Sequence, residues 1–283
     1  MKLFHNLKHS PIYNLVILVI VPWTILAIIF GFTDLEISKT IVNADSLWGK
    51  IGKEYAHIPA YTLISISIAI LMGGYFEDLK QQKIIGVLIS LFVMKFISEF
   101  KKLIYPKDIY LYFDFYIILG LIIFSILTFK KDWKEYTTIS IVILLLIAIL
   151  TLSVDITKVL CGRVRFVDLN SDFSNYTPWF LPPGPDPYNA SFPSGHTAQG
   201  WILLPLLILI KDREWKDPIK IIATILVIGW GLFVAISRVI IGAHYASDVL
   251  FSSGAAALIT ILLYKWFYLD NQNKKLRKDE EKR

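Results

Sequence analysis

The sequence is poor in charged residues and almost free of cysteine. Only 18% of its 283 residues are Asp, Glu, Lys or Arg, whereas 55% are hydrophobic. Soluble domains have about 25% charged residues, so this chain has too little charge to cover a soluble globule of its size. The single cysteine, Cys161, excludes an intramolecular disulfide. The net charge of +6 comes from short basic clusters and not from a continuous basic face, so no nucleic acid partner is predicted.

The hydrophobic residues form long runs. A helix of about 20 apolar residues crosses the hydrocarbon core of a bilayer. The sequence therefore predicts an all-α fold, a polytopic transmembrane helical bundle of about eight spans, with six as the lower limit. The third span is interrupted by charges, among them Lys95 and Glu99, and the sixth is short. The predicted spans are residues 12–32, 58–76, 84–104, 109–129, 136–156, 197–210, 219–236 and 246–268.

The basic residues orient the chain in the membrane. If the N-terminus is inside, most of the 29 Lys and Arg residues lie in the segments predicted to be inner, as the positive-inside rule requires. The segments 157–196 and 237–244 then lie outside, and the charged segment 269–283 is a cytoplasmic tail. Nothing in the sequence indicates a eukaryotic secretory route. The prediction is a multi-pass protein of the plasma (cytoplasmic) membrane of a bacterium.

Polar residues gather where the last four predicted spans meet the outer face. Three of them are cations, two are histidines and one is a carboxylate. The guanidinium fork of Arg matches the non-bridging oxygens of a phosphate, Lys adds a point charge, and Gly lets the backbone approach closely. These residue types predict a site for a phosphate ester. The residues are Lys158 and Arg165 after the fifth span, Ser194, Gly195 and His196 before the sixth, and Arg238, His244 and Asp248, which bridge the seventh and the eighth.

The spacing of these residues suggests their roles. His244 and Asp248 are four residues apart, so they share one face of a helix. A carboxylate that accepts from one imidazole nitrogen leaves the other for attack, so His244 is the predicted nucleophile and Asp248 orients it. His196 is the predicted general acid. Ser194 is predicted to cap a helix whose N-terminus favours an anion. Because three cations already neutralise the phosphate, neither a metal nor another cofactor is predicted.

Three motifs at these positions resemble the type 2 phosphatidic acid phosphatase family. They are K-x6-R over residues 158–165, P-S-G-H over 193–196 and S-R-x5-H-x3-D over 237–248. Phe166 stands where the family has proline, and five predicted spans precede the first motif where family members typically have three. The resemblance covers residues 136–268, the predicted phosphatase core, whereas residues 1–135 form predicted helices without a recognised motif. Soluble vanadate-dependent haloperoxidases are related through the same anion site, but the apolar spans argue against that class.

The resemblance implies a membrane phosphatase that hydrolyses a phosphate monoester, or the terminal phosphate of a diphosphate, on a lipid at the outer face. It implies a phosphohistidine at His244, oriented by Asp248, with His196 acting first as acid and then as base for water. The implied partners are a phosphorylated lipid substrate and the membrane lipids. The residues implied to hold the phosphoryl oxygens are Lys158, Arg165, Ser194, Gly195 and Arg238.

Alternatives remain for the function and for single residues. The same site could pass the phosphoryl group to a lipid or sugar acceptor, and a transporter or lipid-binding protein is a further alternative. Arg163 either takes part in the site or is a plain loop or headgroup contact. Lys95 and Glu99 either snorkel to the membrane boundary or bind substrate. The aromatic segment 173–192 serves packing or covers a headgroup. Neither the particular lipid nor the oligomeric state follows from the sequence.

Overall fold

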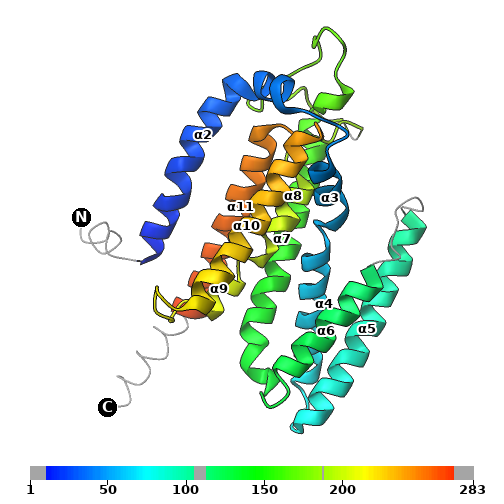
Figure 1. Ribbon diagram of the computed structural model, residues 1–283, viewed down its shortest axis with the longest axis vertical. Helices are drawn as coiled ribbons and strands as arrows, with labels where there is room; N and C mark the ends of the chain where they lie inside the picture. Colours follow the sequence, from blue (N-terminus) through cyan, green and yellow to red (C-terminus); the bar gives the residue numbers. More distant parts are fainter. Residues whose placement is uncertain (1–10, 105–112, 187, 271–283) are drawn as a thin grey trace. The chain divides into compact units, whose positions relative to one another are not determined.

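The structure is a computed structural model that describes residues 11–104, 113–186 and 188–270. These residues form helices and irregular segments, with no strand among them (Figure 1). This confirms the predicted all-α fold. The α-helices are α2 (Pro11–Ile41), α3 (Leu47–Tyr55), α4 (Ile58–Gly73), α5 (Leu79–Ile104), α6 (Phe113–Leu127), α7 (Thr137–Cys161), α8 (Gly195–Gly200), α9 (Leu206–Leu209), α10 (Pro218–Ile240) and α11 (Ala246–Tyr264). The shorter helical turns are η1 (Trp133–Tyr136), η2 (Phe166–Asp168), η3 (Trp201–Leu203) and η4 (Lys265–Leu269).

Among the described residues, five helical segments are long and apolar enough to cross a membrane, and they match the first, second, fifth, seventh and eighth predicted spans. The segments are Ile12–Ile41, Leu47–Gly73, Trp133–Asp168, Pro218–Ile240 and Ala246–Leu269. The polytopic helical bundle is therefore confirmed, and five of the eight predicted spans correspond to segments of this length and apolarity in the described part of the chain.

The other three predicted spans are not both long and apolar enough to be counted among these segments, and each has a physical reason. α5 is 26 residues long but carries the charges that interrupted the prediction. The sixth is broken into α8, η3 and α9, because Pro205 cannot continue the hydrogen-bond ladder of a helix. In the fourth, residues 109–112 lie outside the described part of the chain, and its described helix, α6, has 15 residues.

The described residues divide into two compact units. Residues up to 56 and from 146 onward form one unit, and residues 57–145 form the other. The predicted N-terminal segment, residues 1–135, therefore contributes helices to both units. The predicted cytoplasmic tail overlaps the described residues only at positions 269 and 270.

In the first unit, α11 packs against α2, α8 and α10, and α10 also packs against α3 and α8. Gly254 of α11 allows close approach to α2, because an added Cβ would lie 2.4 Å from Nε1 of Trp23. Trp179, from the aromatic segment, donates a hydrogen bond from Nε1 to the carbonyl of Ala27 at 2.9 Å, and its ring lies 4.6 Å from that of Phe251. The aromatic segment thus packs onto α2 and α11, which agrees with the packing role predicted for it.

In the second unit, α5 and α6 pack against α4. Trp133 is completely buried and donates a hydrogen bond from Nε1 to Thr128 Oγ1 at 2.9 Å, which satisfies its polar atom. Lys95 and Glu99 form an ion pair of 2.9 Å along α5, and both side chains are more than half exposed. The buried core consists of Ala69, Ile70, Met94, Ile117, Leu121 and Trp133.

Candidate active site

Ser194 begins α8 as its N-cap. Its Oγ accepts hydrogen bonds from the Thr197 backbone N–H at 3.3 Å and from the Thr197 hydroxyl at 2.9 Å. This is the predicted cap, and it satisfies a backbone donor that the first helical turn leaves without a partner. The Ser194 backbone N–H donates to the carbonyl of Asp248 at 3.2 Å, which joins the second motif to the third.

Lys158, in the last turn of α7, reaches the start of α8. A Cβ added to Gly195 would lie 3.3 Å from Nζ of Lys158. A glycine at this position leaves the ammonium group room beside the backbone of the capped turn. The first motif is therefore in contact with the second.

Two arginines extend this positive region. Arg165, at the start of η2, and Arg238, in the last turn of α10, interact electrostatically with Lys158 and with each other. Nε and Nη1 of Arg238 and Nε of Arg165 are buried and have no hydrogen-bond partner among the described residues. Buried guanidinium donors are costly unless they meet an acceptor. Their arrangement with Lys158 fits a phosphoryl group, which offers several anionic oxygens.

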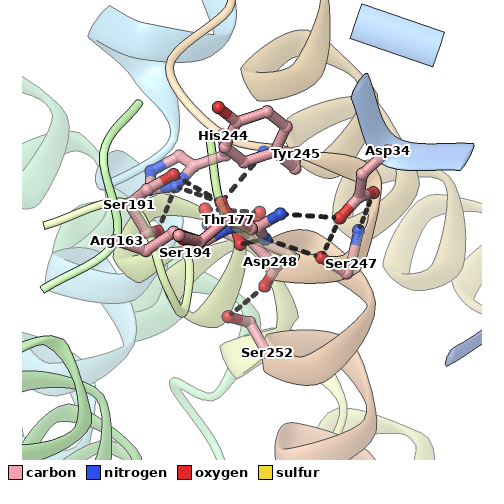
Figure 2. Close-up of polar contacts among 11 residues, drawn as sticks. Asp34, Arg163, Thr177, Ser191, Ser194, His244, Tyr245, Ser247, Asp248 and Ser252 are labelled. Atoms are coloured by element: carbon pink, nitrogen blue, oxygen red, sulfur yellow. Dashed lines mark hydrogen bonds and ion pairs between the residues drawn. The ribbon is translucent and has the colours of Figure 1, made fainter. Parts of the chain in front are cut away.

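His244 follows α10 and is buried beside these cations. Its Nδ1 lies 2.6 Å from the carbonyl oxygen of Ser191. Because a carbonyl only accepts hydrogen bonds, Nδ1 carries the proton and the lone pair is on Nε2. Oδ2 of Asp248 lies 3.6 Å from the same Nδ1, which is longer than a hydrogen bond (Figure 2). The predicted neighbourhood of His244 and Asp248 is present, but the hydrogen bond that orients the imidazole goes to Ser191.

Burial lowers the pKa of His244 to about 4, and the Lys158 and Arg238 charges act in the same direction, whereas Asp248 opposes them. Neutral imidazole is consequently the form present at pH 7. A neutral imidazole with its lone pair on Nε2 is the nucleophilic form.

Asp248 is completely buried at the N-terminus of α11. Its Oδ1 accepts from Arg163 Nη1 at 2.6 Å, and its Oδ2 accepts from the Ser191 hydroxyl at 2.6 Å and from the Tyr245 backbone N–H at 2.9 Å. The last contact belongs to a capping box with Tyr245. Asp248 therefore holds three segments of the site together besides lying next to His244.

For Arg163 the sequence left two interpretations open, a part in the site or a plain loop or headgroup contact, and the structure excludes the second. It is only 1% exposed, so the plain loop or headgroup contact is wrong. Nε donates to the Thr177 carbonyl at 2.9 Å, Nη1 to Asp248 and to Ser247 Oγ at 2.8 Å, and Nη2 to Asp34 at 3.0 Å. The guanidinium also lies 4.0 Å from the centre of the Tyr245 ring. A buried arginine with two carboxylates is a structural centre of this region.

Asp34 and Ser191 are site residues that the motifs did not indicate. Asp34 is a completely buried carboxylate in the first apolar helix, and a buried ionisable residue in such a helix is a signal of function. Ser191 lies two residues before the P-S-G-H motif and had no signal of its own.

His196 is the second residue of α8 and is half-buried. α8 packs against both α10 and α11, which flank His244 in the sequence. No group of three or more His, Cys, Asp or Glu side chains that could hold a metal ion occurs within residues 11–104, 113–186 and 188–270.

Two comparisons relate the chain to known proteins. Residues 138–272 match the sequence model of the PAP2 superfamily. Over 81 residues the chain is 40% identical to phosphatidylglycerophosphatase B of Haemophilus influenzae, an alignment that covers 26% of this chain and 31% of that relative. The chain thus matches less than a third of the relative's length. No solved structure matches the chain. Since residues 138–272 contain all three motifs of the site, the match supports the resemblance of this part of the chain to the type 2 phosphatidic acid phosphatases.

Proposed function

We propose that this protein hydrolyses the phosphate of a lipid, a phosphate monoester or the terminal phosphate of a diphosphate, through a phosphohistidine at His244. The observation that carries the proposal is the set of buried guanidinium donors on Arg165 and Arg238, beside Lys158 and a neutral imidazole. These donors suit an anion, and the imidazole supplies a nucleophile for its phosphorus.

In the proposed first step, Nε2 of His244 attacks phosphorus and the bond to the lipid oxygen breaks. Lys158, Arg165 and Arg238 stabilise the charge on the phosphoryl oxygens. The proton on Nδ1 stays in its hydrogen bond to Ser191, so the phosphorylated imidazole is cationic and is stabilised by the nearby Asp248 carboxylate. His196 gives its proton to the leaving alkoxide.

In the proposed second step, His196 accepts a proton from water, and the resulting hydroxide attacks the phosphohistidine. The bond between phosphorus and Nε2 breaks, which releases inorganic phosphate and restores neutral His244. No step requires a metal or another cofactor.

A lipid is the substrate class best supported by the surroundings of the site. The site residues lie at the ends of long apolar helices that could cross a membrane. The H. influenzae relative is named a phosphatidylglycerophosphatase. A small pocket between α7 and α8 adjoins Gly195, and its lining includes the apolar Leu150, Val154 and Ile202 and the polar Thr151, Asp155 and Gln199. Apolar side chains next to a cationic centre suit a molecule with an anionic head and an apolar body.

The first test of the proposal is phosphate release from short-chain phosphatidic acid by the detergent-purified protein. Release should be unchanged by a chelator or by added magnesium, and vanadate should inhibit it competitively. Vanadate adopts the five-coordinate geometry of the transition state, so a site built for that state binds it more tightly than phosphate. A rate that collapses with the chelator and returns with magnesium would refute the metal-free mechanism. No release from any of several lipid phosphates would refute the function.

The outer-face location of the site is also a proposal, supported by the distribution of basic residues. In a Cys161→Ser background, cysteine at Ser171 in the long loop should react with an impermeant maleimide in intact cells. Cysteine at Lys216, between α9 and α10, should react only after lysis if the sixth predicted span, residues 197–210, crosses the membrane despite its broken helix. Both positions are exposed, so access to the reagent is limited by the membrane alone. The opposite labelling pattern would place the site inside.

A further inference from the structure

Asp34 connects α2 to the site through two buried groups. Its Oδ2 accepts from Nη2 of Arg163 at 3.0 Å and from the Ser247 hydroxyl, and its Oδ1 accepts from the Ser247 backbone N–H at 2.9 Å (Figure 2). Asp34 is completely buried. It lies more than 100 residues before the part of the chain that matches the PAP2 superfamily.

Arg163 also contacts Asp248 and Ser191, the two residues that face Nδ1 of His244. Its guanidinium donates to Asp248, the carboxylate next to His244, at 2.6 Å. Its backbone carbonyl accepts from the Ser191 N–H at 3.0 Å, and the Ser191 carbonyl in turn accepts from His244. One arginine therefore contacts the two groups that face Nδ1 of His244.

The charges of this chain of contacts determine how Asp248 acts on His244. A single guanidinium paired with a single carboxylate would largely cancel the negative charge of Asp248. Asp34 offers Arg163 a second carboxylate, so the three groups together have a formal charge of −1. Because they are buried, these charges are weakly screened. The excess negative charge favours the cationic imidazole that forms when His244 is phosphorylated.

We propose that Asp34 is a positioning residue of the active site, which holds Arg163 and balances its charge so that Asp248 can stabilise the phosphorylated His244. This inference rests on the proposed phosphohistidine mechanism. It makes α2 a part of the site, although the three motifs contain no residue of this helix.

The attachment of α2 to the rest of its unit does not depend on Asp34 alone. The ring of Trp23 lies 4.6 Å from that of Phe251 on α11, and the carbonyl of Ala27 accepts from Trp179. A substitution that removes only the charge of Asp34 therefore leaves other contacts to keep α2 in place.

The decisive experiment compares Asp34→Asn with wild-type protein on a short-chain lipid phosphate. The amide keeps the size of the side chain and removes its charge. We expect kcat to fall about 10- to 100-fold, a range typical of groups that act through a catalytic side chain, while KM stays within about twofold, because the phosphate-binding cations are untouched. Quenched-flow labelling should show slower formation of phosphoenzyme.

Two further variants separate charge from structure. Ser38→Ala, one turn later on α2, alters another completely buried residue whose Oγ has no partner within the described residues, and it should keep wild-type kcat. Asp34→Glu retains the charge and should keep kcat within about threefold of wild type. If Asp34→Asn gives no monodisperse protein, Asp34→Glu decides: a loss of kcat at unchanged KM in this variant would overturn the charge argument.

The outcomes also separate this inference from the proposed function. A wild-type protein without phosphatase activity would refute the function itself, whatever the variants do. An active wild-type protein with a folded Asp34→Asn variant of unchanged kcat would refute the role of Asp34 and leave the function in place. Equal losses in Asp34→Asn and Ser38→Ala would show that α2 acts only by packing.

Discussion

Replacing His244 with alanine should abolish turnover and the phosphoenzyme. Without the imidazole no group in the proposed mechanism can form the covalent intermediate, so the loss should be many orders of magnitude, whereas loss of a group that only stabilises charge costs about 10²–10³-fold. The measurements are phosphate release and acid-quenched labelling with a radioactive lipid phosphate. Binding of vanadate should persist, because the Arg and Lys donors are unchanged.

The matched control is His57→Ala, which removes a histidine that begins α4 and belongs to none of the three motifs. It should keep wild-type activity. A His244→Ala variant that retained a tenth of the wild-type rate would show that this residue is not the nucleophile.

Replacing Arg163 with methionine should have the largest effect on stability. Methionine fills similar volume but leaves the carboxylates of Asp34 and Asp248, both 0% exposed, without their shared cation. Breaking a buried ion pair from one side costs about 3–5 kcal/mol. The free energy of unfolding, measured in mixed detergent micelles, should fall by about that amount.

Arg213→Met is the control for this prediction. Arg213 pairs with Asp217 at 2.7 Å, but its side chain is 45% exposed, so solvent can replace the pair. This variant should unfold like the wild type. If the free energy of unfolding of Arg163→Met equals that of Arg213→Met, the buried carboxylates must be accommodated in another way, for example by protonation.

The local features of the site could be predicted because neighbouring residues determine them. Ser194 was expected to cap a helix, and it does so with the Thr197 N–H three residues later. Asp217 and Pro218 start α10 by the same local rule, although no cap was predicted there: Asp217 accepts from the Ile219 N–H at 2.8 Å, and proline suits the first turn. The prediction of Asp248 next to His244 depended on a spacing of four residues, and the two are neighbours.

The partners of these residues could not be predicted in the same way. The hydrogen bond that orients His244 joins it to a residue 53 positions earlier, and the ion pair of Arg163 with Asp34 spans 129 positions. No local pattern encodes such contacts, because they exist only once α2, the aromatic segment and α11 have packed together. Arg163 in particular has the same neighbours in sequence whether it faces headgroups or lies in the core.

The sequence alone determined the membrane character of the chain, its helices and the residue types of a phosphate site, because hydrophobic runs, caps and motif spacing act over a few residues. Only the tertiary structure decided which acceptor faces Nδ1 of His244 and which charge balances Arg163. Those choices depend on burial: away from water each polar group must find its partner within the protein, and the packing of distant helices determines which partner is within reach.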